Sequence, residues 1–358
     1  MSKRFFRSLF FLPLLALPFL SSVKTYGQQE PKGRVERIKV HGKGLEGNLA
    51  GDPADRDVSV YLPAGYNKDP KRRYPVVYFL HGFTDDDAQW YGFKKHWINL
   101  PQILDKVFAW GGAREMIVVT PNAYNRFHGS FYSNSVTTGN WEDFVSKELV
   151  ASIDARYRTL ARPESRGLCG HSMGGYGGMR IAQKHPEVFS SVYLLSPCCL
   201  LPVPNNPPRP EALARQDSVK TVADFEKADF GTRAAFATAA AWAPNPQNPP
   251  LYLDLPYQNG QLQPLVQTKL WANMPLATLD QYIPNLKQLR ALGFDAGTQD
   301  VAIAAGLRAL DSSLSVYSIP HQFEIYEGNH INRVGERIEQ KMLGFFSQNL
   351  SFEERKKK

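Results

Sequence analysis

One serine of this chain stands in a context that favours nucleophilic chemistry. Ser172 lies in the stretch Gly170-His171-Ser172-Met173-Gly174-Gly175, with glycines two positions before and two positions after it. A Cβ atom at either glycine would collide with neighbouring backbone in a tight turn from a strand into a helix. Such a turn raises the serine hydroxyl above the sheet edge, at the positive end of the following helix. A serine that only caps a helix is the alternative.

A serine hydroxyl is a weak nucleophile at neutral pH, so it requires a base and a group that orients the base. In α/β sheets with this kind of turn, the partners come from loops after later strands, in the order serine, acid, histidine. Asp300 follows a short predicted strand at 293–296, and His330 follows another at 323–326. We therefore expect Asp300 and His330 at the sheet edge that carries Ser172, as the orienting acid and the base.

Other residues compete for these two roles. Asp295 lies inside a predicted strand, where it is expected to cap or pair structurally. His321 precedes the last strand and should lie at the opposite sheet edge, while His171 is held beside the nucleophile on the wrong side. The remaining candidates occupy segments typical of loops or helix ends: His41, His96, His128 and His185.

Acyl transfer also requires two N–H donors for the developing oxyanion, and losing one costs roughly a hundredfold or more in rate. One donor is expected at the backbone of Met173, where the helix begins. The other is expected in the loop after the strand at 75–80, and we assign it to Phe83. The same loop contains Asp85-Asp86-Asp87. Three consecutive side chains point in different directions, which favours a solvated loop over a cation site.

Eight short runs predict the strands of one sheet. Those at 35–40 and 58–62 alternate apolar and polar residues, as half-buried antiparallel strands do. Those at 75–80 and 116–120 are almost continuously apolar, which is typical of parallel strands covered on both faces. Further strands are expected at 167–169, 191–195, 293–296 and 323–326, and helices at 142–158, 176–185, 301–313 and 333–348. This alternation predicts an α/β, doubly wound, mostly parallel sheet flanked by helices.

Residues 1–27 have the pattern of a secretory signal: a basic start, an apolar run and small residues. The apolar run at 8–20 is interrupted by two prolines and is too short to cross a bilayer as a helix. We therefore expect a secreted or periplasmic protein without a membrane span in its mature chain. Its catalytic domain is expected at 28–350, followed by a charged tail at 351–358.

The excess positive charge lies at the two ends of the chain. The formal net charge is +8, of which four charges fall in residues 1–27 and four in 355–358, so the part between them is neutral. A nucleic-acid-binding protein is expected to carry a basic face on its folded body. Nucleic acid is therefore not an expected partner.

Three cysteines are present. Cys169 precedes the serine turn, and Cys198 with Cys199 follows the next predicted strand. Their spacing fits no metal site. Two arrangements are compatible with the sequence. In one, Cys169 forms a disulfide with Cys198 or Cys199, and in the other all three are buried thiols.

Several stretches of the chain resemble the esterase D-like family of putative esterases. This α/β-hydrolase group includes S-formylglutathione hydrolases, antigen 85 mycolyltransferases, and feruloyl and acetylxylan esterases. The matching stretches extend over nearly the whole mature chain, at 60–66, 78–82, 170–175, 297–300 and 328–330. The resemblance implies the roles already reached from the strand ends: Ser172 as nucleophile, Asp300 as acid, His330 as base, and Phe83 with Met173 in the oxyanion hole. No cofactor or metal is required for that chemistry.

The chain departs from the compact members of that family between Ser172 and Asp300. Proline-rich stretches at 202–210 and 244–256 enclose an Ala-rich helical stretch. We expect a helical insertion over about 200–290, placed above the active-site edge where such folds carry lids. Its aromatic residues either form a stacking wall for the substrate or form the insertion's own core. They are Phe225, Phe230, Phe236, Trp242, Tyr252, Tyr257, Trp271 and Tyr282.

We expect an exported serine ester hydrolase that forms an acyl-enzyme. By analogy with the family, esters linked to polysaccharide, such as feruloyl or acetyl esters, suit an exported member better than cytosolic S-formylglutathione does. An acyltransferase of the mycolyltransferase kind would use the same three residues, with an alcohol in place of water. A non-catalytic carbohydrate-binding protein on a hydrolase scaffold is a third hypothesis, and the presence of all three residues argues against it.

Overall fold

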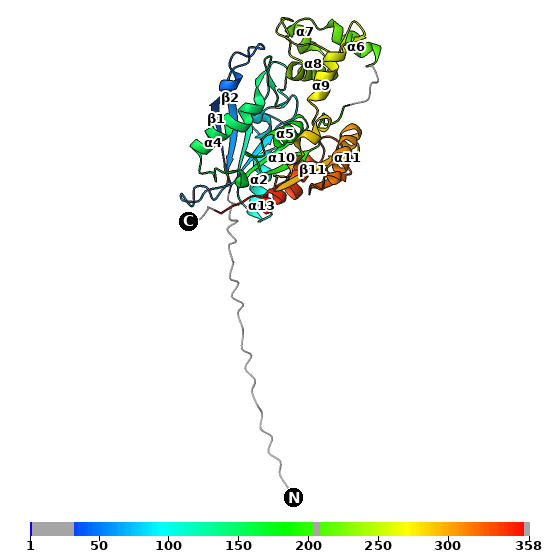
Figure 1. The fold of residues 1–358 in the computed structure, drawn as a ribbon. Helices are drawn as coiled ribbons and strands as arrows, with labels where there is room; N and C mark the ends of the chain where they lie inside the picture. Colours follow the sequence, from blue (N-terminus) through cyan, green and yellow to red (C-terminus); the bar gives the residue numbers. More distant parts are fainter. Residues whose placement is uncertain (2–31, 203–207, 354–358) are drawn as a thin grey trace. The chain divides into compact units, whose positions relative to one another are not determined.

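The computed structural model describes Met1 and residues 32–202 and 208–353. The expected signal segment 1–27 falls outside the described residues except for Met1, and so do residues 354–358 of the expected tail. Eight strands form one sheet in the order β1-β2-β4-β3-β7-β8-β11-β12 (Figure 1). β2 pairs antiparallel with β1 and β4, and every pair from β4 to β12 is parallel. The predicted mostly parallel α/β sheet is confirmed.

Each of the eight strands overlaps a run that the sequence predicted. Their bounds are β1 Arg34–His41, β2 Asp55–Leu62, β3 Val76–Leu80, β4 Ile117–Pro121, β7 Arg166–His171, β8 Ser191–Leu195, β11 Ala291–Gly297 and β12 Gln322–Tyr326. Two short hairpins lie outside the sheet, β5 Asn134–Ser135 with β6 Gly139–Asn140, and β9 Tyr257–Gln258 with β10 Gln261–Leu262.

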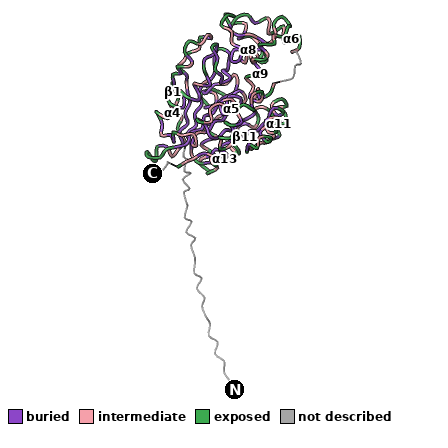
Figure 2. The backbone as a smooth tube through the Cα atoms, in the orientation of Figure 1, coloured by how far each residue is buried: buried purple, intermediate pink, exposed green. Residues whose placement is uncertain are grey.

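The strands are apolar because both faces of the sheet are covered. Along β3, Val76, Tyr78 and Leu80 enter one apolar cluster, and Val77 and Phe79 enter the other. None of these five side chains is exposed. Successive strand residues point to opposite faces, so a run without polar residues fits only a strand covered on both sides. The buried interior runs through the sheet, and exposed residues lie on the outer helices and loops (Figure 2).

Two sets of helices cover the two faces. α4, α5, α8 and α11 contribute to the first cluster, and α2 and α13 contribute to the second. The helix bounds are α1 Asp87–Trp90, α2 Leu100–Ala109, α3 Trp141–Asp143, α4 Val150–Arg156, α5 Met173–Lys184, α6 Pro210–Ser218, α7 Val222–Lys227, α8 Phe230–Trp242, α9 Pro264–Ala272, α10 Ile283–Leu286, α11 Val301–Val316, α12 Val334–Arg337 and α13 Leu343–Asn349. Within the described ranges, none of the helices is long and apolar enough to cross a bilayer.

Two predicted helices differ in detail from those observed. The helix expected at 142–158 consists of α3, a π-helical segment at Phe144–Leu149, and α4, which ends at Arg156. The helix after Ser172 begins at Met173, three residues earlier than expected, and ends at Lys184. Its early start follows from the glycines of the serine turn, which allow the chain to enter the helix directly from β7.

The chain between β8 and β11 contains α6 to α10 and the β9–β10 hairpin. α6, α7, α8 and α9 lie together at the top of Figure 1, and α13 lies at the bottom. Of the aromatic residues in this region, Phe225, Phe236 and Trp242 are buried. Trp242 packs against Phe131, with ring centres 5.3 Å apart, so these residues also join the region to the rest of the domain.

Candidate active site

The turn between β7 and α5 has the backbone conformation that its glycines predict. Ser172 has φ of 57° and ψ of −114°, a sparsely populated conformation that costs a non-glycine residue about 1–3 kcal/mol. An added Cβ on Gly174 would overlap the carbonyl oxygen of Leu80, and one on Gly170 would overlap the carbonyl of Gly174. The strained conformation of Ser172 is retained because the surrounding backbone is packed too closely for the chain to adopt another conformation there.

Three side chains from the ends of three strands form one hydrogen-bonded row. The Nε2 atom of His330 lies 2.9 Å from Oγ of Ser172, and its Nδ1 atom lies 2.6 Å from Oδ2 of Asp300. Ser172 follows β7, Asp300 follows β11 and His330 follows β12. Because the carboxylate accepts the proton of Nδ1, Nε2 is left free to accept the proton of the serine hydroxyl. The row is therefore suited to deprotonate a nucleophilic hydroxyl.

The loops that carry Asp300 and His330 are joined through their backbones. The N–H of Thr298 donates to the carbonyl of Tyr326 at 2.7 Å, and the N–H of Gln299 donates to that of Gly328 at 2.9 Å. A Cβ on Gly297 would overlap the Gly328 carbonyl. This contact holds the carboxylate at a constant distance from the imidazole and limits the orientations that the imidazole adopts.

His171 contacts the backbone of the loop that carries His330. Its side chain is buried, and its Nε2 atom lies 2.9 Å from the backbone carbonyl of His330. Burial, followed by the neighbouring His330, lowers the pKa of His171 to about 4. A neutral ring that meets a carbonyl through Nε2 must donate its proton there. The sequence excluded His171 as the base, but it contained no sign of this contact, which joins residues 159 positions apart.

The competing acid and base of the sequence analysis lie outside the row. Asp295 is fully buried, accepting from Arg337 Nε at 2.9 Å and from the hydroxyl of Tyr193 at 2.8 Å. Burial raises the pKa of Asp295 although the Arg337 charge opposes the rise. His321 instead pairs with Asp311, with Nε2 and Oδ1 2.9 Å apart. Asp295 and His321 therefore make structural contacts and do not contact Ser172.

The two predicted oxyanion donors belong to segments that meet beside Ser172. A Cβ on Gly82 would lie 3.6 Å from Cβ of Ser172, so the loop after β3 adjoins the serine. A Cβ on Gly129 would lie 2.6 Å from Sδ of Met173 and 2.8 Å from the ring of Phe83. The Phe83 and Met173 side chains therefore meet across Gly129. The N–H of Met173 lies in the first turn of α5, which leaves it without a partner in the helix.

The predicted solvated loop at Asp85-Asp86-Asp87 is wrong, although its side chains do point in different directions. Asp86 and Asp87 are buried, and each of the three carboxylates has its own partner. The partners are the indole of Trp90 for Asp85, the backbone N–H of Gln89 for Asp86, and Arg37 with Ser59 for Asp87. The partners of Asp85 and Asp86 lie within five residues of them, whereas those of Asp87 are distant in the chain and could not be predicted from the local sequence. Within residues 32–202 and 208–353, no three metal-ligating side chains gather at one place.

All three cysteines are free thiols. Cys169 is buried on the sheet face of the second apolar cluster, whereas Cys198 and Cys199 pack against the first. The sheet therefore separates Cys169 from the adjacent pair. Of the two arrangements compatible with the sequence, the structure has the unlinked thiols.

Comparison with known proteins agrees with this architecture. A family model described as "Putative esterase" matches residues 53–333. An esterase of Mycobacterium tuberculosis is 27% identical over 289 residues, covering 77% of this chain and 52% of the relative. An endo-1,4-beta-xylanase/feruloyl esterase of Xylanibacter ruminicola is 32% identical over 141 residues, covering 38% of this chain and 19% of the relative. The chain thus spans about half the length of the first of these curated relatives and less of the second.

Solved structures share the fold at low identity. A ferulic acid esterase superposes with a TM-score of 0.62 at 21% identity, covering 89% of this chain and 99% of that one. An S-formylglutathione hydrolase from Agrobacterium tumefaciens superposes with a TM-score of 0.55 at 17% identity, covering 90% and 98%.

Proposed function

Because the chain belongs to the putative esterase family, we propose that it hydrolyses carboxylic esters through an acyl-enzyme. In this proposal Ser172 is the nucleophile, His330 is the base and Asp300 orients the base. The observation that carries it is the row in which His330 lies 2.9 Å from the serine hydroxyl and 2.6 Å from the carboxylate. The strained backbone at Ser172 supports it, because such strain collects at functional sites.

The reaction begins with attack of the Ser172 oxygen on the ester carbonyl, while Nε2 of His330 takes the hydroxyl proton. The carboxylate of Asp300 stabilises the imidazolium that forms. When the tetrahedral intermediate collapses, the same proton passes from Nε2 to the leaving alcohol, and the acyl group remains on Ser172.

The negative charge of the intermediate falls on the former carbonyl oxygen. We assign its donors to the backbone N–H groups of Met173 and Phe83. The packing of the Phe83 loop against Ser172 supports this assignment, as does the position of Met173 in the first turn of α5. The positive end of a helix favours negative charge at that point.

Water then releases the acyl group. His330 takes a proton from the water as it attacks, and returns that proton to the oxygen of Ser172 when the bond breaks. The side chain of His330 is 36% exposed, so solvent reaches the base. This exposure favours hydrolysis over transfer to an alcohol, because transfer requires that water be excluded.

The proposed substrates are esters linked to carbohydrate, such as feruloyl or acetyl esters. The name of the bifunctional Xylanibacter relative supports this choice. A cluster of aromatic rings beside the serine turn also supports it, since Phe83 packs against Phe131 at 6.0 Å and Phe230 at 5.5 Å between ring centres. Phe230 is 61% exposed and offers an aromatic surface to a phenolic group. The signal pattern of residues 1–27 supports export to where such polymers occur.

A fluorophosphonate probe tests the nucleophile. We expect the probe to label the wild-type protein and to leave Ser172→Ala unlabelled. Turnover of p-nitrophenyl acetate tests the base, with His330→Ala expected to lose it. His321→Ala is the matched control and should retain turnover, because His321 contacts Asp311 and not Ser172. Equal labelling of wild type and Ser172→Ala, or loss of turnover only in His321→Ala, would refute the assignment.

A further inference from the structure

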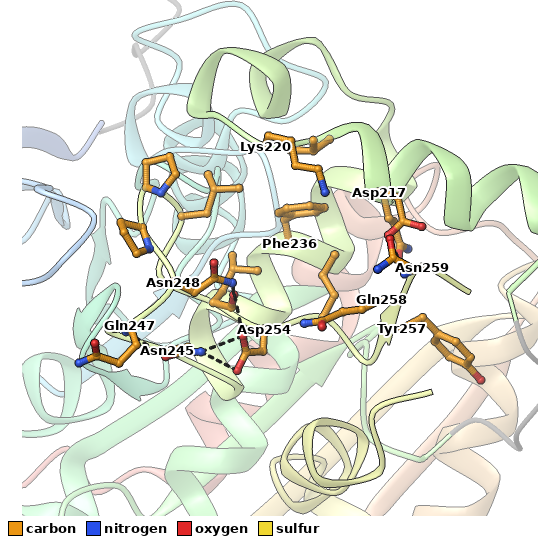
Figure 3. A pocket seen from close by; sticks show the side chains of 17 residues that line it. Asp217, Lys220, Phe236, Asn245, Gln247, Asn248, Asp254, Tyr257, Gln258 and Asn259 are labelled. Atoms are coloured by element: carbon orange, nitrogen blue, oxygen red, sulfur yellow. Dashed lines mark hydrogen bonds between the residues drawn. The ribbon is translucent and has the colours of Figure 1, made fainter. Parts of the chain in front are cut away.

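A hollow lies in the region between β8 and β11, and its lining does not include Ser172, Asp300 or His330. It has a volume of about 670 Å³ and is lined by the end of α6, by α8, by the loop at 245–255 and by β9 (Figure 3). Small-molecule sites are concave and commonly have volumes of about 300–1,000 Å³. The hollow is therefore large enough to hold a ligand of several rings.

The floor of the hollow is held in place by its own hydrogen bonds. Nδ2 of Asn245 donates to both carboxylate oxygens of Asp254 at 2.9 Å, and Nδ2 of Asn248 donates to the carbonyl of Leu253 at 2.7 Å. Figure 3 shows the bonds from Asn245 to Asp254, together with a longer one of 3.4 Å from Nδ2 of Asn248 to Oδ1 of Asp254. A site whose polar groups are already fixed loses little conformational entropy when it binds.

Other polar side chains around the hollow have no partner. In the described part of the chain, the amides of Gln216, Gln247 and Gln258 and the ammonium of Lys220 make no hydrogen bond or ion pair. Lys220 points toward the hollow from one side, and the Gln258 amide faces it from the other (Figure 3). An amide both donates and accepts hydrogen bonds, as a hydroxyl group does. The lining therefore fits a ligand that carries many hydroxyl groups.

Charge and burial argue against anionic and apolar ligands. The positive charge of Lys220 is opposed by the carboxylates of Asp217 and Asp254, so the lining does not select an anion. Most of its apolar members are at most 9% exposed and offer little surface to an apolar ligand: Val219, Phe236, Leu251, Leu253 and Leu255. Apart from Pro249 and Pro250, the exposed lining is mostly polar.

We propose that this hollow binds a neutral oligosaccharide. α8 connects it to the serine turn, because Phe236 lines the hollow and Phe230, six residues earlier, packs against Phe83. Six residues of helix span about 9 Å. A sugar chain held in the hollow thus extends toward the site where its ester groups react. That last link rests on the proposed function, whereas sugar binding itself does not.

Calorimetric titration with two unesterified probes, xylohexaose and cellohexaose, tests the proposal without any catalysis. We expect saturable binding of at least one probe by the wild-type protein. Gln258→Ala and Lys220→Ala should each lower the affinity about three- to tenfold, the effect of one lost hydrogen bond. Gln261→Ala is the matched control, because Gln261 is exposed, pairs with Gln258 in the same hairpin and does not line the hollow. Its affinity should equal that of the wild type.

Three outcomes would overturn the proposal: no saturable binding of either probe, unchanged affinity in both Gln258→Ala and Lys220→Ala, or tighter binding of an anionic galacturonate hexamer. Turnover of p-nitrophenyl acetate is measured on the same samples and should not change in the three variants. Turnover without sugar binding contradicts this proposal alone. Sugar binding without turnover supports it and contradicts the proposed function alone.

Discussion

Two aspartates, Asp295 and Asp300, belong to the same strand-and-loop segment, and we expect their replacement by asparagine to affect different properties, stability for Asp295 and kcat for Asp300. Asp300→Asn should lower kcat about 10⁴-fold, because the amide NH2 can donate a hydrogen bond to Nδ1 and so hold the His330 proton on Nε2, the wrong tautomer. Asp295→Asn should leave the row intact, because Asp295 contacts Arg337 and Tyr193 and not His330. Its effect should fall on the free energy of unfolding.

The expected loss of stability in Asp295→Asn follows from the burial of its partner. The Arg337 side chain is only 4% exposed, so removal of the Asp295 charge leaves a buried guanidinium with one carboxylate, Glu324, which is 41% exposed. Breaking such a pair costs about 3 kcal/mol, the lower end of the usual range because Glu324 remains. For a domain of about 320 residues that loss lowers Tm by about 4 °C.

Thermal unfolding and p-nitrophenyl acetate turnover, measured on both variants, separate the two roles. The expected pattern is a lower Tm with nearly normal kcat for Asp295→Asn, measured well below its Tm. For Asp300→Asn it is a much lower kcat with a smaller change in Tm. If folded Asp295→Asn lost turnover while Asp300→Asn kept it, the strand-end reasoning for the acid would be wrong.

Two further perturbations test the packing around the serine turn and the response to acid. Gly174→Ala should abolish folding or lower Tm by several degrees, because its Cβ would overlap backbone, whereas Gly344→Ala, with open space around it, should not lower Tm. Equal Tm values in the two variants would contradict the close approach. Although burial raises the pKa of Glu142, His185, whose Nε2 lies 3.5 Å from Oε1 of Glu142, and the charge of Arg180 outweigh this, and the net pKa falls to about 2. The folded pKa lies below the unfolded value, so this stability is present above about pH 4.5 and is lost as pH falls toward 2. Urea unfolding at pH 6 and pH 3 should show a loss about 2 kcal/mol larger in wild type than in Glu142→Gln, and equal losses would refute the pairing.

Local patterns in the sequence were sufficient for the order of strands and helices. Alternating residues predicted β1 and β2, and apolar runs predicted β3 and β4, because a strand covered on both faces has no room for polar side chains. The glycines around Ser172 predicted the turn, because only glycine fits where an added Cβ would meet backbone. The positions of Asp300 and His330 just after two predicted strands then indicated that they would lie at the sheet edge that carries Ser172.

The tertiary structure alone decided how distant side chains pair. The burial of Asp87 by Arg37, the ion pair of Asp295 with Arg337, and the contact of His171 with the His330 carbonyl each join segments far apart in the chain. No local periodicity encodes such a pair, because its two members become neighbours only when several elements pack together. For the same reason the hollow beside α8 was absent from the sequence analysis. Its polar lining comes from separate elements whose side chains meet only in the folded chain.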